Sequence, residues 1–92
     1  MEFWVRLKDA IKGIDDLATK YPDRMILSIQ RQLRAVEQWT KGGYRPAQQD
    51  LDRLSFGLLA SRSVDELDQK LAQELYELSS YLIFWPPNQP KR

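Results

Sequence analysis

Carboxylates are the only side chains of this chain that have the number and spacing needed for acid–base chemistry. The 92 residues contain no histidine and no cysteine, so an imidazole base, a thiolate nucleophile and the metal sites built from them are excluded. The closely spaced acidic residues are Asp15 and Asp16, Asp50 and Asp52, and Asp65, Glu66 and Asp68. Two carboxylates act as general acid and base only where the fold holds them around one substrate.

The sequence around these carboxylates favours structural roles over catalysis. Asp65 and Glu66 precede a helical pattern, where acidic groups stabilise the positive end of the helix dipole. For Asp50 and Asp52 two interpretations stay open, because they could stabilise a helix start or present negative charge to a basic partner. The sequence has no Gly-rich phosphate loop, no Gly-x-Ser-x-Gly motif and no Glu-x-x-His pair. We therefore predict that the protein is not an enzyme and holds no cofactor and no metal.

Two further groups of side chains could bind a partner. The basic group is Arg24, Arg31, Arg34 and Lys41, and the aromatic group is Trp4, Trp39, Tyr44 and Trp85. The basic group is typical of a solvated helix face, with phosphate contact as the alternative. The aromatic residues fit either interface anchors or the edge of a core. Because the net charge is only +1, we expect no nucleic-acid partner.

Helices must position these side chains, because no segment alternates between polar and apolar residues as a strand does. Proline, glycine and serine interrupt the pattern at three places, and Gly42-Gly43 can adopt the left-handed conformation that ends a helix. The predicted helices cover residues 3–20, 23–41, 47–61 and 64–84. Short connections favour antiparallel neighbours, so the predicted fold class is all-α, a small antiparallel four-helix bundle. We expect a single helical domain over residues 1–85 and a Pro-rich, disordered C-terminal tail over residues 86–92.

The predicted core consists of apolar residues that recur at steps of three and four. It contains Leu7, Ile11, Ile14, Ile29, Leu33, Val36, Leu51, Leu54, Leu58, Leu67, Leu71, Leu75 and Leu78. The run Ser63–Glu66 has the pattern of a capping box for the last helix. Gly57, in the third predicted helix, would let another helix approach closely. The last helix also has a second, partly apolar face, which either a neighbouring helix or a protein partner covers; its members are Ala72, Tyr76, Ser79 and Ile83.

The first residues, Met-Glu-Phe-Trp-Val-Arg, lack the features of a signal peptide. No apolar run approaches the roughly 20 residues that span a membrane. We therefore expect a cytoplasmic protein without a membrane partner.

Three segments carry a resemblance to a known family. They are Leu17-Ala18-Thr19-Lys20-Tyr21-Pro22, Ile26–Leu33, and Arg53–Ala60 followed by Asp65, Leu71 and Tyr76. Together they resemble the Tsi-type immunity proteins of bacterial type VI secretion, and are similar to the member that neutralises an NAD(P)-degrading effector. The resemblance implies an antitoxin that binds a toxin domain and covers its active site without chemistry of its own.

The residues and the resemblance lead to the same functional hypothesis. We predict an immunity protein whose partner is a cognate effector toxin domain, with an NAD(P)⁺ glycohydrolase as the leading candidate. A toxin cleft that binds phosphates is basic, so carboxylates and aromatic rings should meet it. The predicted toxin-binding residues are Asp50, Asp52, Asp65, Glu66, Asp68, Tyr44 and Trp39. The alternatives are a small helical nucleic-acid-binding regulator and an adaptor subunit of a larger assembly.

Overall fold

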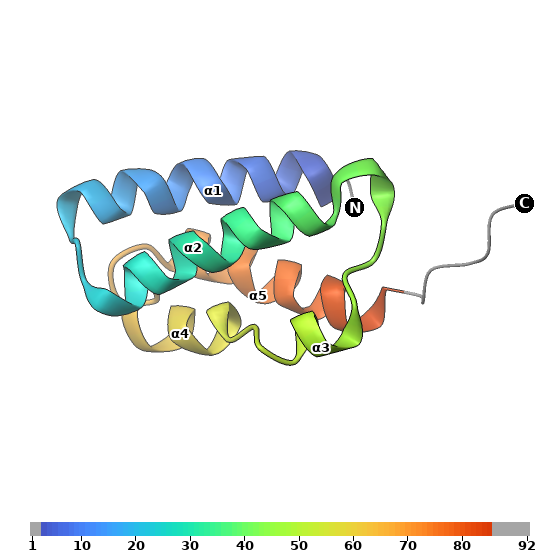
Figure 1. Ribbon diagram of the computed structural model, residues 1–92. Helices are drawn as coiled ribbons and strands as arrows, with labels where there is room; N and C mark the ends of the chain where they lie inside the picture. The colour runs from blue at the N-terminus through green and yellow to red at the C-terminus, as the bar shows by residue number, and fades with distance from the viewer. Residues whose placement is uncertain (1–2, 86–92) are drawn as a thin grey trace, which may run out of the picture.

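The computed structural model describes residues 3–85, which form helices joined by turns (Figure 1). In chain order the elements are α1 (Phe3–Lys20), α2 (Arg24–Trp39), the 3-10 helix η1 (Lys41–Gly43), α3 (Gln48–Leu51), α4 (Phe56–Ser63) and α5 (Gln69–Phe84). The described residues contain no strand, and the predicted all-α class is confirmed. The predicted disorder of the tail, 86–92, lies outside the described residues.

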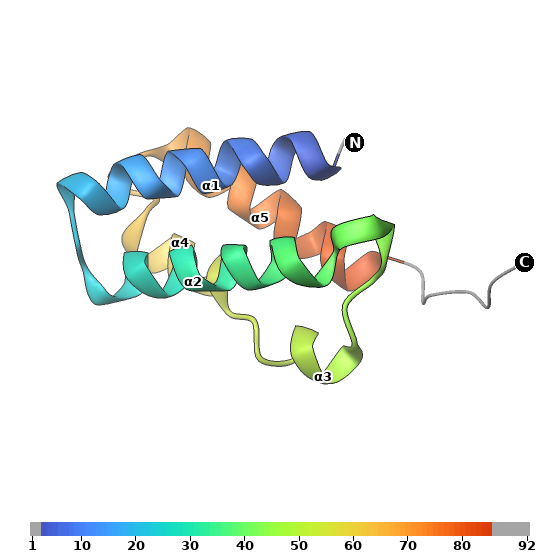
Figure 2. The same ribbon diagram turned by 45° about the horizontal axis from the view of Figure 1, so that its top comes forward.

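Four helices make up the bundle. Helix α1 packs against α2, α2 against α4, α4 against α5, and α5 against α1, which closes a ring. The chain direction alternates from one helix to the next, so neighbours are antiparallel (Figure 1). In this ring α2 and α5 are diagonally opposite. Helix α3 is a short turn that lies beside the bundle, in the connection between η1 and α4 (Figure 2).

Helix α2 begins and ends with the residues that local backbone chemistry favours. Asp23 is its N-cap, and the Asp23 carboxylate accepts a hydrogen bond from the Met25 N–H at 3.0 Å. At the other end, Gly42 and Gly43 have φ angles of 81° and 85°, as predicted from the sequence. The buried hydroxyl of Thr40 donates to the Val36 carbonyl at 2.7 Å, which satisfies its one polar group. The chain therefore turns sharply after α2 and runs toward α3.

The third predicted helix, 47–61, is wrong as a single element. Helix α3 ends at Leu51 and α4 starts only at Phe56. The break is stabilised by α2, where the Gln32 side chain accepts a hydrogen bond from the Ser55 N–H at 2.7 Å and donates to the Ser55 hydroxyl at 3.2 Å. Ser55 precedes the first residue of α4, so Gln32 satisfies a backbone donor at a helix start. A contact between residues 23 positions apart leaves no trace in a local pattern.

The predicted start of the last helix at residue 64 is also wrong. Ser63 is the last residue of α4, and its hydroxyl donates to the Leu59 carbonyl at 2.7 Å. The cap of α5 is Asp68, whose carboxylate accepts from the Leu71 N–H at 3.0 Å. Val64, fully buried, anchors the connection between the two helices. The predicted capping box at Ser63–Glu66 is therefore not formed.

The shifted elements explain the errors in the predicted core. The residues confirmed as buried are Leu7, Ile11, Ile14, Ile29, Leu33, Val36, Leu71, Leu75 and Leu78, whereas Leu51 and Leu54 are half-buried. Leu58 and Leu67 were predicted wrongly, because their side chains are 56% and 44% exposed. Phe56, Ala60 and Val64 fill this part of the core instead. None of the helices in the described part of the chain combines the length and apolar character needed to cross a bilayer.

Candidate functional site

The residues predicted to bind a toxin lie at two ends of the bundle. Figure 1 places α3 beside the C-terminal end of α5, and the connection from α4 to α5 near the turn between α1 and α2. Tyr44, Asp50 and Asp52 belong to the first end, and Trp39 leads into it. The carboxylates at 65, 66 and 68 belong to the second end. The structure therefore brings the residues of each group together but separates the two groups.

At the first end, a chain of hydrogen bonds connects α3 to the end of α5. The Arg45 side chain donates to the Trp85 carbonyl at 2.8 Å and to the Gln48 side chain at 2.9 Å. Gln48 in turn donates to the Asp52 carboxylate at 2.9 Å. Asp52 therefore takes part in holding α3 in place. Tyr44 is 62% exposed in the same region, and Trp39 is half-buried against the core.

The aromatic residues near this end pack mainly on one another. The Phe3 ring stacks on Tyr81 with 5.0 Å between centroids, and it lies 5.3 Å from Trp85 and 6.3 Å from Trp4. Trp4, Tyr81 and Trp85 are half-buried against the core. The sequence allowed four aromatic residues to be either interface anchors or part of the edge of the core. Three of them, Trp4, Trp39 and Trp85, lie at the edge of the core. Among those four, Tyr44 is the exposed one.

The outer face of α5 carries an open hollow. Its volume is about 430 Å³, and it is lined by Gln73, Tyr76, Glu77, Ser80, Tyr81 and Phe84. These positions follow helical spacing, so they form one open strip along α5. Phe84 is 82% exposed and neighbouring Ile83 is 64% exposed. Exposed apolar side chains gathered on one helix are typical of an interaction surface.

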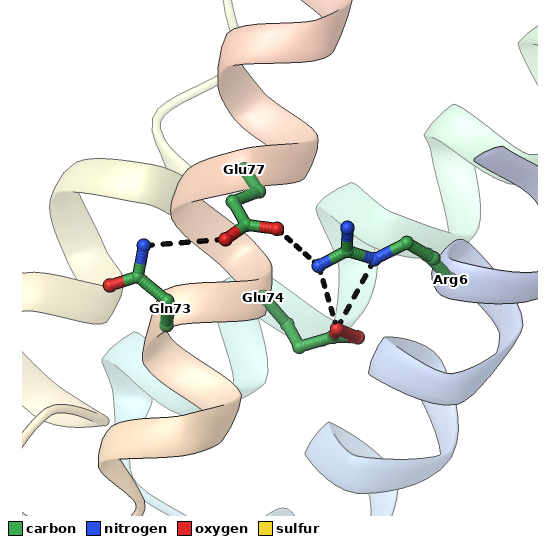
Figure 3. Close-up of polar contacts among 4 residues, drawn as sticks. All are labelled: Arg6, Gln73, Glu74 and Glu77. Atoms are coloured by element: carbon green, nitrogen blue, oxygen red, sulfur yellow. Dashed lines mark hydrogen bonds and ion pairs between the residues drawn. The ribbon is translucent and has the colours of Figure 1, made fainter. Parts of the chain in front are cut away.

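A hydrogen-bonded network of charged groups reaches this hollow through Gln73 and Glu77 (Figure 3). The Arg6 guanidinium, from α1, donates to the Glu74 carboxylate at 2.9 and 3.3 Å and also to the Glu77 carboxylate. Gln73 donates to the second oxygen of Glu77 at 3.4 Å. The hydrogen bonds from Arg6 and then Gln73 lower the pKa of Glu77, and the same two glutamates raise the pKa of Arg6. Glu77 is thereby kept ionised and fixed in orientation.

Asp65 is the predicted site residue that the structure links to this face. Partial burial raises the pKa of the Tyr76 hydroxyl, and the negative charge of Asp65 raises it further. Asp65 therefore lies within electrostatic reach of the hollow. Glu66 lines a smaller hollow of about 310 Å³ with Tyr21 and Met25, at the turn between α1 and α2. Asp68 is occupied as the cap of α5.

Charge is distributed unevenly between the two diagonal helices. Between Asp65 and Phe84 the sequence has five carboxylates and one lysine. Helix α2 instead has three arginines and one glutamate. Arg34 is already paired, with the Asp15 carboxylate at 2.7 Å and more distantly with Glu37 at 3.9 Å. Two of the five carboxylates, Glu74 and Glu77, are on α5 itself, and the other three lie in the connection before it. The stretch from Asp65 to Phe84 is thus net acidic and α2 is net basic, despite the small net charge of the molecule.

The second apolar face of α5 is covered in one part and exposed in another. Near Gly57, α4 covers it: a Cβ added to Gly57 would lie 3.1 Å from the Ser79 hydroxyl oxygen and 3.2 Å from the Ser79 Cβ. The predicted close helix approach at Gly57 is therefore confirmed. Tyr76 is half-buried and Ile83 stays exposed. Sequence reasoning identified this face but missed Glu77 and Phe84; the available signal was their spacing of four residues from Gln73 and Ser80, respectively.

The arrangement on α5 is suited to binding. Among the described residues, no group of three or more carboxylates is placed to hold a metal ion. The hollow is open, and it combines aromatic rings with the fixed carboxylate of Glu77. Rings and charges of this kind recur at the centres of protein interfaces.

Comparison with known proteins identifies one family. A family model described as Tsi6 matches residues 6–84, nearly all of the described chain. No curated protein and no solved structure matches the chain.

Proposed function

The chain belongs to the Tsi6 family of Tsi-type immunity proteins, and we propose that it binds a cognate effector toxin domain and covers the active site of that domain. The observation that carries this proposal is the open aromatic hollow on α5 with carboxylates beside it. A protein that acts by occlusion needs an exposed surface with apolar anchors and complementary charge. It needs no catalytic group of its own.

We propose further that the toxin domain is an NAD(P)⁺ glycohydrolase. A cleft that binds a dinucleotide must attract phosphates, so its rim is positive. The excess of carboxylates between Asp65 and Phe84 is complementary to such a rim. Charges of opposite sign accelerate encounter and fix the orientation of the complex.

The interface in this proposal is centred on the α5 hollow and includes Asp65, whose charge acts on Tyr76, together with Glu66 in the connection before α5. Asp50, Asp52, Tyr44 and Trp39 lie at the other end of α5, toward Tyr81 and Phe84, and remain a prediction for a second area of contact. Asp68 also remains a predicted contact, with the added role of capping α5.

Binding and protection test the proposal directly. The proposed function predicts that the gene of this protein lies directly downstream of its toxin gene, so the partner to test is the toxin domain encoded immediately upstream. That domain should form a stoichiometric complex with this protein, and its NAD(P)⁺ consumption should stop. This protein alone should consume no NAD(P)⁺. An intact toxin activity in the presence of excess protein would refute the proposed function.

Two matched substitutions locate the interface. Ser80→Arg adds a long cation to the floor of the α5 hollow, and Gln38→Arg adds the same side chain to the exposed surface of α2. Because a cation on α5 would repel a basic cleft, Ser80→Arg should weaken the complex at least about tenfold. Gln38→Arg should bind like wild type. The double variant Asp50→Lys and Asp52→Lys tests the end of the bundle at α3 in the same assay, and a loss confined to it would move the interface there.

A further inference from the structure

The α5 hollow has the chemistry of a receptor for one positively charged side chain. Its aromatic members come from three successive turns of the helix and are Tyr76, Tyr81 and Phe84. Tyr81 is immobilised because its ring stacks on Phe3. The Phe84 ring projects from the bundle, with 82% of the residue exposed. Aromatic faces carry negative electrostatic potential, so they attract cations.

The Glu77 carboxylate lies beside these rings and retains unused capacity. One of its oxygens accepts from Arg6, while the other accepts only the long 3.4 Å bond from Gln73 among the contacts described. Each carboxylate oxygen can accept two hydrogen bonds. The side chain of Glu77 is 41% exposed, so a partner can reach it. Arg6, Glu74 and Glu77 together carry one negative charge in excess.

These features favour arginine over lysine as the occupant. A guanidinium group is planar, stacks on aromatic rings and donates several hydrogen bonds in fixed directions. A carboxylate held by Arg6 and Gln73 loses little freedom when it accepts them. Lysine offers a compact, strongly hydrated charge that gains less from a ring.

We propose that the α5 hollow receives an arginine side chain of the toxin domain, with the guanidinium against Phe84 and Tyr76 and hydrogen-bonded to Glu77. This inference rests on the proposed function and specifies the chemistry of the partner. The excess of carboxylates along residues 65–84 supplies the charge complementarity for an arginine-bearing surface. Arginine and aromatic residues are also the types that dominate interface energetics.

Binding of the upstream-encoded toxin domain to three variants tests the inference. Glu77→Gln removes the charge and keeps the shape, and it should weaken binding about tenfold and reduce the dependence on salt. Phe84→Leu keeps an apolar side chain and removes the ring, and it should weaken binding roughly threefold to thirtyfold. Glu37→Gln is the control, because it makes the same change in an ion pair on α2. This control should bind like wild type.

The outcomes separate the inference from the proposed function. If wild type neither binds nor inhibits the toxin domain, the proposed function is wrong. If wild type inhibits it while Glu77→Gln and Phe84→Leu bind with unchanged affinity, the inference alone is wrong. Since Phe84 is exposed, its substitution leaves the fold intact even if Glu77→Gln perturbs the network.

A double-mutant cycle identifies the occupant. Each exposed arginine of the toxin domain is changed to alanine and measured against wild type and Glu77→Gln. One arginine should couple to Glu77 by at least about fivefold in affinity, whereas the others should be additive. If the effects of Glu77→Gln and of every arginine substitution on affinity are additive, the inference is overturned, even if the wild-type complex is tight.

Discussion

Substitutions at Asp68 can distinguish a structural role of this residue, as the cap of α5, from a role in toxin binding. Its carboxylate accepts the Leu71 N–H at 3.0 Å and so satisfies one of the free donors at the start of α5. Replacing an N-cap by alanine costs about 1 kcal/mol, within a range of about 0.5–2. For a domain of this size, about 1 kcal/mol corresponds to a fall of roughly 4–8 °C in melting temperature. We expect Asp68→Ala to melt lower than wild type by that amount, as measured by circular dichroism.

Asp68→Ser separates the cap from the charge. The serine hydroxyl can accept the same backbone hydrogen bond, so this variant should keep most of the melting temperature while losing the negative charge. Asp65→Ala is the control, since Asp65 lies in the same connection but does not cap α5. Its melting temperature should change little. Equal melting temperatures for Asp68→Ala and wild type would refute the capping role. Weaker toxin binding by Asp68→Ser at unchanged stability would establish the predicted contact.

Three further predictions concern the packing and charges around α5. Gly57→Ala places a Cβ 3.1 Å from the Ser79 hydroxyl oxygen, so overpacking of about 1–3 kcal/mol should offset or exceed the gain of about 1 kcal/mol in helix propensity; a clearly higher melting temperature would contradict this. Leu75→Ala, at a fully buried position, should lower the free energy of unfolding in urea by about 2–5 kcal/mol. Because the folded state lowers the pKa of Glu77 from its ordinary 4.5, the stability that its ionised form contributes is present above that pH and lost as pH falls through the folded pKa. The melting temperatures of wild type and Glu77→Gln should therefore differ at pH 7 and converge in acid.

The helices were predictable because their apolar residues repeat with the period of a helix. The break before Phe56 was not, since it depends on Gln32 reaching across from α2 to Ser55. Helical periodicity reports which side of a segment is apolar, and it carries no information on a side chain from elsewhere that ends the segment. Leu58 entered the predicted core for this reason: its spacing fits a continuous helix that does not form.

The start of α5 illustrates a competition between two valid local signals. Ser63–Glu66 fits a capping box, and Asp68 fits an N-cap for the following residues. Packing decides between them. Val64 is fully buried, and the N–H groups of Val64 and Asp65 bond to the Ala60 carbonyl at 2.9 and 3.0 Å. These bonds close the end of α4, so the chain is free to start a new helix only after the turn.

The sequence predicted that part of the last helix needs a cover, but it did not predict where the exposed surface would lie. The partly apolar second face of the last helix was evident from Tyr76 and Ile83, but its cover depends on which helix lies beside it. The ring order puts α4 there, with Gly57 against Ser79, and leaves the strip from Gln73 to Phe84 open. Glu77 became significant only through Arg6, a residue 71 positions away.

The small net charge of the molecule hides an uneven distribution of charge between α2 and the stretch that includes α5. A charge of +1 suggests a molecule with almost no field, yet α2 carries a net excess of arginine, whereas α5 and the connection before it carry a net excess of carboxylates. On α2, Arg34 is already engaged by Asp15 and Glu37. On α5, Arg6 is shared between two glutamates, and one negative charge remains. Because the net acidic stretch from Asp65 to Phe84 includes the helix that bears the exposed aromatic hollow, electrostatic attraction and apolar contact favour the same orientation toward a basic partner.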